Sequence, residues 1–175
     1  DDATLNVLVP PGITGQPQDV TVIAGTATNL AVIVTGSLPR QFQWRRNGTN
    51  LSGATNAFLA FTNIGPADAG AYSVVVSNGA GSVTSGNATL TVLESPGITS
   101  QPQDQTVSVG GTANFSVTAT GTAPLDYHWR KDGSLLAGET NSSLVITNVS
   151  LATAGVYQVR VANVAGGVVS SNATL

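Results

Sequence analysis

Apolar and polar residues alternate along short stretches of this chain. In residues 30–34 the apolar positions 30, 32 and 34 share one face of an extended strand, and residues 72–76 show the same pattern. Equivalent alternation occurs at 115–119 and 157–161. A period of two is that of a β-strand with one buried face, and no stretch keeps the 3.6-residue period of an amphipathic helix. The pattern predicts an all-β fold of short strands separated by glycine, proline and asparagine.

The same pattern occurs twice along the chain. The segment PGITGQPQD at residues 11–19 returns almost unchanged at 96–104, and Trp44 returns as Trp129, at a constant offset of 85 residues. A repeat of this length corresponds to a small domain rather than to one turn of a solenoid. The 175 residues therefore predict two tandem domains, each large enough for one hydrophobic core.

Turn residues separate the strands at matching places in the two repeats. Asn47-Gly48 in the first repeat and Asp132-Gly133 in the second are pairs that readily adopt the positive φ angles of a tight hairpin. We therefore expect a hairpin turn at each pair, shortly after the tryptophan of each repeat.

Each repeat resembles an immunoglobulin domain of the I-set type. The shared positions are a glycine before the second strand, a tryptophan on the third, an Asp-x-Gly-x-Tyr motif and an Asn-x-x-Gly motif. They are Gly25, Trp44, 68–72 and 78–81 in the first repeat, and Gly110, Trp129, 155–157 and 163–166 in the second. The resemblance covers residues 11–93 and 96–175, and it implies two tandem immunoglobulin-like Greek-key β-sandwiches joined by a short linker.

The resemblance also implies which residues form the two cores. The family cysteines are replaced by Val32 with Val74 and by Val117 with Val159, and the chain has no cysteine at all. Two valines can fill the volume of a disulfide, so the core stays packed without oxidation. The other implied core residues are Trp44, Trp129, Tyr72 and Tyr157.

Tyr72 and Tyr157 are implied to be tyrosine-corner residues, whose hydroxyl groups hydrogen-bond to nearby backbone. Asp68 precedes Tyr72 in the first repeat, but Thr153 stands at the equivalent position of the second. The loss of this carboxylate predicts that the second corner is held less firmly.

The repeat divides the chain into four segments. Residues 1–10 are a tail strand of a preceding repeat or a strand-exchange segment, and residues 11–93 are the first immunoglobulin-like domain. Residues 94–95 are a linker, and residues 96–175 are the second domain, with its last strand incomplete. Pro96 fixes its own φ angle and restricts the residue before it, which predicts limited bending between the domains.

The first residues of the chain align with the ends of both domains. Residues 2–5 match 87–90 and 172–175 at the same offset. Two interpretations remain open: the chain is part of a longer tandem array, or residues 2–5 complete the last strand of a neighbouring subunit. Both predict neighbouring copies of the repeat as partners, either in tandem or strand-exchanged.

Composition narrows the classes of function. The formal net charge is −3 and only 9% of residues are charged, which is too weak for electrostatic capture of nucleic acid or an anionic membrane. No apolar run approaches the roughly 18 residues of a membrane span. The abundance of Thr, Ser, Asn, Ala, Gly and Val is typical of secreted repeat proteins. It predicts a secreted or cell-surface protein of bacterial origin.

The chain shows no candidate active site. Its only histidine, His128, is replaced by Gln43 in the first repeat, and the nine carboxylates are scattered along the sequence. Without an activated nucleophile, a placed acid–base pair or a phosphate-binding loop, we expect no catalytic residue and no enzyme activity. We likewise expect no metal site and no cofactor.

Two groups of outward-facing residues are candidate interfaces. In the first repeat, Ile33 and Phe58 lie on strands that neighbour each other in this fold and form a candidate apolar patch. In the second, Arg130 and Arg160 lie with His128 on adjacent strands and form a small basic group suited to an acidic glycan. The alternative for each is an ordinary solvated sheet surface.

Three classes of function are compatible with these observations. The leading one is a set of structural or spacer modules in an extracellular or cell-surface repeat protein, such as a fibre or stalk. The second is an adhesion module that binds a surface protein or a polysaccharide. The third is a pair of accessory domains in a secreted hydrolase, since the fold alone does not determine function.

Overall fold

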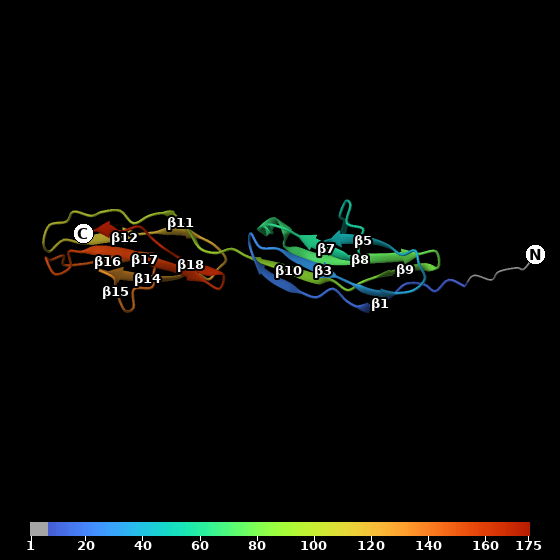
Figure 1. Cartoon of the computed structure of the whole chain (residues 1–175). Helices are drawn as coiled ribbons and strands as arrows, with labels where there is room; N and C mark the ends of the chain where they lie inside the picture. The colour runs from blue at the N-terminus through green and yellow to red at the C-terminus, as the bar shows by residue number, and fades with distance from the viewer. Residues whose placement is uncertain (1–6) are drawn as a thin grey trace, which may run out of the picture. The chain divides into compact units, whose positions relative to one another are not determined.

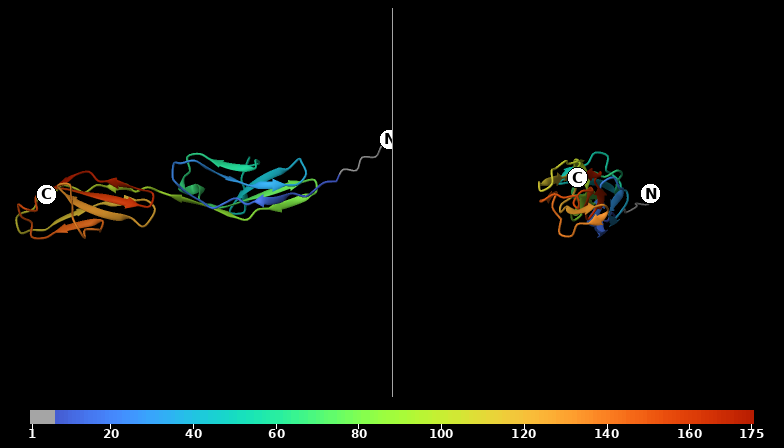
Figure 2. Two further views of the ribbon diagram at one scale, coloured as in Figure 1. Left: turned by 60° about the horizontal axis from the view of Figure 1, so that its bottom comes forward. Right: turned by 90° about the vertical axis from the view of Figure 1, so that its left-hand side faces the viewer.

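The computed structural model describes residues 7–175, which divide into two compact units with the boundary between Val92 and Leu93 (Figure 1). Each unit consists of β-strands in two layers (Figure 2). The only helical element in the described residues is a short 3-10 turn, η1, at Pro66–Asp68. The predicted all-β fold of two tandem sandwiches is confirmed. The predicted tail strand at residues 2–5 lies outside the described residues.

The first domain has a small layer of two strand pairs and a larger sheet. The small layer pairs β1 (Gly12–Gly15) with β4 (Ile33–Thr35), and β3 (Thr28–Ala31) with β7 (Phe58–Phe61). The larger sheet has the order β2 (Val20–Ile23), β10 (Ala88–Leu93), β8 (Gly70–Asn78), β5 (Gln41–Arg46) and β6 (Thr49–Asn50). A further strand, β9 (Gly81–Thr84), also pairs with β8.

The second domain repeats this arrangement. Its small layer pairs β11 (Gly97–Ser100) with β13 (Thr118–Thr120), and β12 (Ala113–Ser116) with β16 (Ser143–Ile146). Its larger sheet has the order β15 (Ser134–Leu135), β14 (Asp126–Lys131), β17 (Val156–Asn163) and β18 (Gly166–Val169). The last strand, β19 (Ala173–Thr174), pairs with β17.

A buried tryptophan lies at the centre of each core. Trp44 on β5 stands directly across from Val74 on β8, and both side chains are fully buried. The Trp44 indole Nε1 donates a hydrogen bond to the Asn56 carbonyl at 2.9 Å, so its one polar atom is satisfied. Trp129 and Val159 repeat the cross-strand pair in the second domain.

Val32 and Val117 complete the two cores. Each lies between two short strands, and both are buried, at 6% and 5% exposure. The valines that replace the family cysteines therefore lie in the same clusters as the tryptophans. Apolar packing takes the place of a covalent bond at this point of each sandwich.

The tyrosine corners are equivalent in the two domains. The hydroxyl of Tyr72 donates to the Asp68 carbonyl and that of Tyr157 donates to the Thr153 carbonyl, both at 2.6 Å. The expected weakening of the second corner is not seen in these bonds. The Thr153 hydroxyl accepts from the Ser150 N–H at 2.9 Å, just as the Asp68 carboxylate accepts from a backbone N–H of its own turn. A hydroxyl thus replaces the carboxylate as the acceptor that closes the turn.

The last strand of each domain pairs with the long central strand of its larger sheet. In the first domain β10 extends to Leu93 and pairs with both β8 and β2. In the second, β19 ends at Thr174, whose carbonyl accepts from the Gln105 N–H at 2.8 Å and whose N–H donates to the Asp104 carboxylate at 2.7 Å. A cavity of about 180 Å³ adjoins this segment, lined in part by Val107 and Leu175.

Candidate interaction surfaces

The segment that leads into the first domain is fastened by hydrogen bonds. The Val9 carbonyl accepts from the Ser37 N–H at 3.0 Å and from the Asn78 side-chain amide at 2.7 Å. The Val9 N–H in turn donates to the Ser37 hydroxyl at 2.9 Å. Asn78 belongs to the Asn-x-x-Gly motif, so this motif holds the preceding chain against its own domain.

The linker into the second domain is fastened in the same way. The Glu94 carbonyl accepts from the Thr122 N–H at 3.0 Å and from the Asn163 side-chain amide at 2.8 Å. The Glu94 N–H donates to the Thr122 hydroxyl at 2.7 Å. Since β10 ends at Leu93, the chain passes from a strand directly to a residue bound by the next domain. The sequence showed Asn78 and Asn163 only as parts of the Asn-x-x-Gly motif and did not predict these hydrogen bonds to the preceding residue, which we call the clamp.

The apolar candidate residues of the first domain are both exposed. Ile33 is 68% and Phe58 is 51% exposed. Phe58 stands opposite Ala31 in the register of β3 and β7, and Ile33 lies two residues beyond Ala31 on the same face. The two side chains therefore occupy diagonal positions on one surface of the small layer.

The absence of a side chain at Gly15 leaves space for the Ile33 side chain. A Cβ atom at Gly15 would lie 2.9 Å from the Ile33 side chain, so Ile33 packs over a bare stretch of β1 backbone. In the second domain Ser100 and Thr118 form the equivalent register pair. The larger apolar residue thus occurs where its neighbour is glycine, and it is partly supported by its own domain.

The basic candidate residues lie on one face of the larger sheet of the second domain. Arg160 on β17 stands directly across from His128 on β14, and Arg130 lies two residues further along β14. A Cβ atom at Gly167 would lie 2.8 Å from the Arg160 guanidinium, so this side chain extends across the neighbouring strand. The Arg130 guanidinium donates to the Gly133 carbonyl at 3.2 Å.

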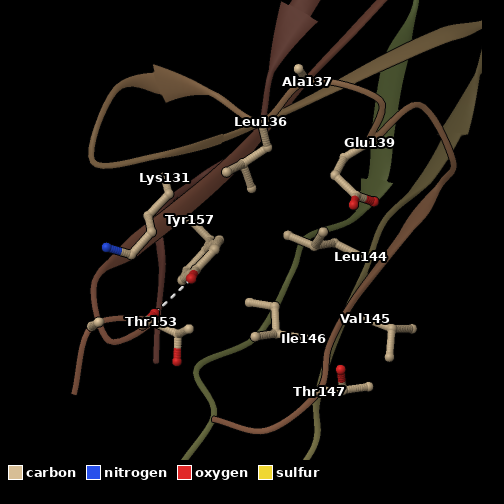
Figure 3. A pocket seen from close by; sticks show the side chains of 11 residues that line it. Lys131, Leu136, Ala137, Glu139, Leu144, Val145, Ile146, Thr147, Thr153 and Tyr157 are labelled. Carbon is tan, nitrogen blue, oxygen red and sulfur yellow. Dashed lines mark hydrogen bonds between the residues drawn. The ribbon is translucent and has the colours of Figure 1, made fainter. Parts of the chain in front are cut away.

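A groove that the sequence did not predict opens beside β16 in the second domain (Figure 3). We call it the β16 groove: it has a volume of about 400 Å³, with apolar side chains of Leu136, Leu144 and Ile146 beside Tyr157. Lys131 and Glu139 also line it. The only sequence signal for it is a set of differences between the repeats at these positions.

The equivalent space in the first domain is filled. Phe61 stands where the second domain has Ile146, and its ring packs edge-to-face on Tyr72 with centroids 5.3 Å apart. Arg46 replaces Lys131, and its guanidinium donates to the carbonyls of Ala67 and Ala69. An aromatic ring and a long planar cation therefore occupy the first domain where the groove opens in the second.

Burial and hydrogen bonding shift three pKa values. Burial raises the pKa of the Tyr72 and Tyr157 hydroxyls, so both stay protonated and can donate at the corners. The hydrogen bond from the Val156 N–H, and then the neighbouring Lys131, lower the pKa of the Asp132 carboxyl. Within residues 7–175 no three potential metal-binding side chains cluster together. None of these groups forms a catalytic constellation.

The repeats match known domain families. Residues 11–92 match the immunoglobulin I-set domain, and residues 95–163 match the immunoglobulin domain. Both halves of the chain are immunoglobulin-like domains. The tryptophans and the tyrosine corners lie within these matches, whereas residues 164–166 of the second Asn-x-x-Gly motif lie just beyond them.

Similar tandem immunoglobulin domains occur in animal proteins. Human leucine-rich repeats and immunoglobulin-like domains protein 1 is 35% identical over 181 residues, which cover 94% of this chain and 16% of the relative. Mouse protein sidekick-2 is 34% identical over 187 residues, which cover 95% of this chain and 8% of the relative. The chain thus spans a small part of these relatives, and the predicted bacterial origin is not supported by them.

A solved structure shows the same fold. An I-band fragment of titin superposes with a TM-score of 0.76 at 22% identity, covering 97% of this chain and 66% of the titin fragment. At this identity the similarity establishes the immunoglobulin fold alone. In the part of the chain that the structure describes, no helix is long and apolar enough to cross a membrane.

Proposed function

We propose that the two immunoglobulin-like domains are extracellular or cell-surface modules that space and present other parts of a repeat protein. The observation that carries this proposal is the repeated clamp, in which Asn78 holds Val9 and Asn163 holds Glu94. A module that fastens the chain before it can be joined in series with little free linker. The tandem immunoglobulin domains of the animal relatives support an extracellular setting.

The clamp on Glu94 is expected to restrict the distance distribution between the domains. Since the chain has no cysteine, one cysteine can be introduced at each of the exposed positions Thr55 and Thr140 to carry a spin label. Pulsed electron–electron double resonance then measures the distance between the two labels. We expect a narrow distance distribution for the otherwise unchanged chain. Asn163→Ala removes the side-chain amide that holds Glu94, and it should broaden the distribution.

Asn78→Ala is the matched control, because it removes the equivalent amide at the lead-in to the first domain and should leave the distribution narrow. A reference variant carries ten Gly and Ser residues between Leu93 and Glu94. If the unchanged chain gives a distribution as broad as this reference, the domains do not act as spacers of defined reach.

A second candidate function is adhesion through the surface that carries Ile33 and Phe58. Their exposure on one face favours a protein partner, since exposed apolar groups often mark interfaces. Arg130 and Arg160 are the corresponding candidates for an acidic polysaccharide. Phe58→Ser and Arg160→Ser separate the two in cell-binding and glycan-binding assays, and unchanged binding in both variants would reject these surfaces. No observation in the structure favours the hydrolase-accessory alternative.

A further inference from the structure

The strand β16 is paired on one side only. Its partner is β12, and among residues 7–175 no strand pairs with its other edge. The Val117 N–H donates to the Ser142 carbonyl in the register of this pair, so even-numbered residues of β16 face β12. In an antiparallel ladder the alternate residues point the other way. The backbone N–H and C=O groups of Ser143 and Val145 are therefore directed to the open edge.

This edge lacks the features that usually protect a strand from pairing. Residues 142–147 contain no charged residue, proline or glycine, and the Val145 side chain is 54% exposed. Natural sheets protect open edges with charges, prolines or bulges, because a bare edge readily accepts another strand. The edge of β16 is thus chemically suited to strand addition.

The β16 groove runs beside this edge, and its two ends carry opposite charges. Leu144 and Ile146 point toward Tyr157, while Glu139 lies next to Leu144 and Lys131 lies on the far side of Tyr157 (Figure 3). The groove therefore has an acidic end near the start of β16 and a basic end near the finish. Apolar side chains line the space between them.

We propose that β16 is a self-association site, at which β16 of a second copy of this chain pairs in antiparallel register. A two-fold axis through Val145 reverses the second groove relative to the first. The Lys131 end of each groove then faces the Glu139 end of the other, so opposite charges meet at both ends of an uncharged strand pair. This self-complementarity favours a second copy as the occupant, and it does not rest on the proposed spacer function.

The first domain is not suited to the same association. The outer edge of β7 is also unpaired among the described residues, but Ala54 stands at the position of Glu139. Phe61 fills the space beside the strand, and Arg46 is bound to the carbonyls of Ala67, within η1, and Ala69, which follows it. Without an acidic end and an open groove, two β7 strands cannot form the opposite-charge pairs that two β16 strands can form.

The Lys131 ammonium already lies 3.0 Å from the Asp132 carboxylate. The two side chains are 25% and 53% exposed, and exposed pairs of this kind hold a lysine only weakly. An ammonium has three donors, so Lys131 can bind a second carboxylate without leaving Asp132. The interface is small, and we therefore expect weak, reversible dimers.

Sedimentation equilibrium of the full 175-residue chain, up to about 1 mM, tests the proposal, because so small an interface binds weakly. The wild-type chain should show a monomer–dimer equilibrium. Val145→Lys places two like charges opposite each other at the two-fold axis, and it should weaken dimerisation by a factor of ten or more, on the order of 1.4 kcal/mol. Ala60→Lys makes the matched change on β7 and should leave dimerisation unchanged.

A charge exchange makes the test independent of folding defects. Glu139→Lys and Lys131→Glu should each be monomeric alone, because like charges then meet at both ends of the groove. Mixing the two variants restores both opposite-charge pairs and should restore dimers. A wild-type chain that stays monomeric at the highest concentration overturns the proposal and leaves the edge to a strand of another protein. A mixture that does not associate, or an equal effect of Ala60→Lys, also overturns it.

Discussion

Asp132 and Asn47 occupy equivalent hairpin turns and accept equivalent hydrogen bonds, but only Asp132 carries a charge. Both have positive φ angles, of 49° and 48°, as expected for the Asp-Gly and Asn-Gly pairs. The Asp132 carboxylate accepts from the Val156 N–H at 2.9 Å, and the Asn47 side-chain oxygen accepts from the Ala71 N–H at 3.0 Å. At the scale of single residues, we therefore expect the hairpins of the two domains to respond differently to pH.

Acid should destabilise the second domain through Asp132. The folded pKa of this carboxyl is lowered, so its stabilisation is present above the unfolded pKa of about 3.9 and is lost as the pH falls through the folded pKa. The Asp132→Asn variant keeps the acceptor oxygen and should lose less stability below about pH 4. Urea unfolding between neutral pH and acid, followed by tryptophan fluorescence, measures this difference.

Asn47→Asp is the reciprocal control and should introduce the same acid sensitivity into the first domain. If Asp132→Asn and the wild-type chain lose stability in parallel as the pH falls, the hydrogen bond from Val156 does not govern the pH response.

At the scale of elements, each domain has one core-facing aromatic ring on the strand pair of its small layer that carries Leu30 and Phe61 or Phe115 and Ile146, but the ring lies on a different strand in each domain. The first domain has Leu30 on β3 and Phe61 on β7, whereas the second has Phe115 on β12 and Ile146 on β16. Phe115 is buried and stacks on Tyr157 with ring centroids 4.9 Å apart. Moving the ring to the inner strand keeps the core filled and leaves the groove open beside β16.

Phe115→Leu should destabilise the second domain, because it removes buried ring atoms and leaves a cavity beside Tyr157. We expect a loss of about 1–3 kcal/mol in the free energy of unfolding. Adding Ile146→Phe reproduces the arrangement of the first domain, and it should recover part of this loss because the total volume is restored. A double-mutant cycle from denaturant unfolding measures the coupling. Additive effects of the two substitutions would show that the positions do not share one packing site.

At the scale of the whole molecule, each domain has a core made of its own residues. Trp44 and Tyr72 lie in one buried cluster, and Trp129 and Tyr157 lie in the other. Each cluster draws on strands of one domain only, which is the condition for the two to unfold as separate cooperative units.

Tyr157→Phe should therefore lower only one of two unfolding transitions. The substitution removes the 2.6 Å hydrogen bond to the Thr153 carbonyl, with an expected cost of about 1–2 kcal/mol. In a domain of this size that corresponds to a fall of several degrees, roughly 4–8 °C per kcal/mol, in the Tm of one transition. Differential scanning calorimetry makes the measurement. Tyr72→Phe should shift the other transition, and a common shift of both would contradict independent folding.

Much of the fold was accessible from the sequence, because the signals for it are local or periodic. The constant offset between Trp44 and Trp129 determined two domains, and the alternation around Val74 and Val159 determined which side chains face each core. A strand's inward face follows from its own period of two, whatever it packs against.

Only the tertiary structure decided how these parts are used. Asn163 holds Glu94 across 69 positions of the chain, and Thr153 takes over a hydrogen bond that its sequence position did not suggest. The groove beside β16 opens where the second domain has Ile146 on β16 in place of Phe61, while the aromatic ring of this strand pair, Phe115, lies on β12. Such features depend on which distant residues come into contact and on the space left between them. A local sequence pattern determines neither the contacts nor the space.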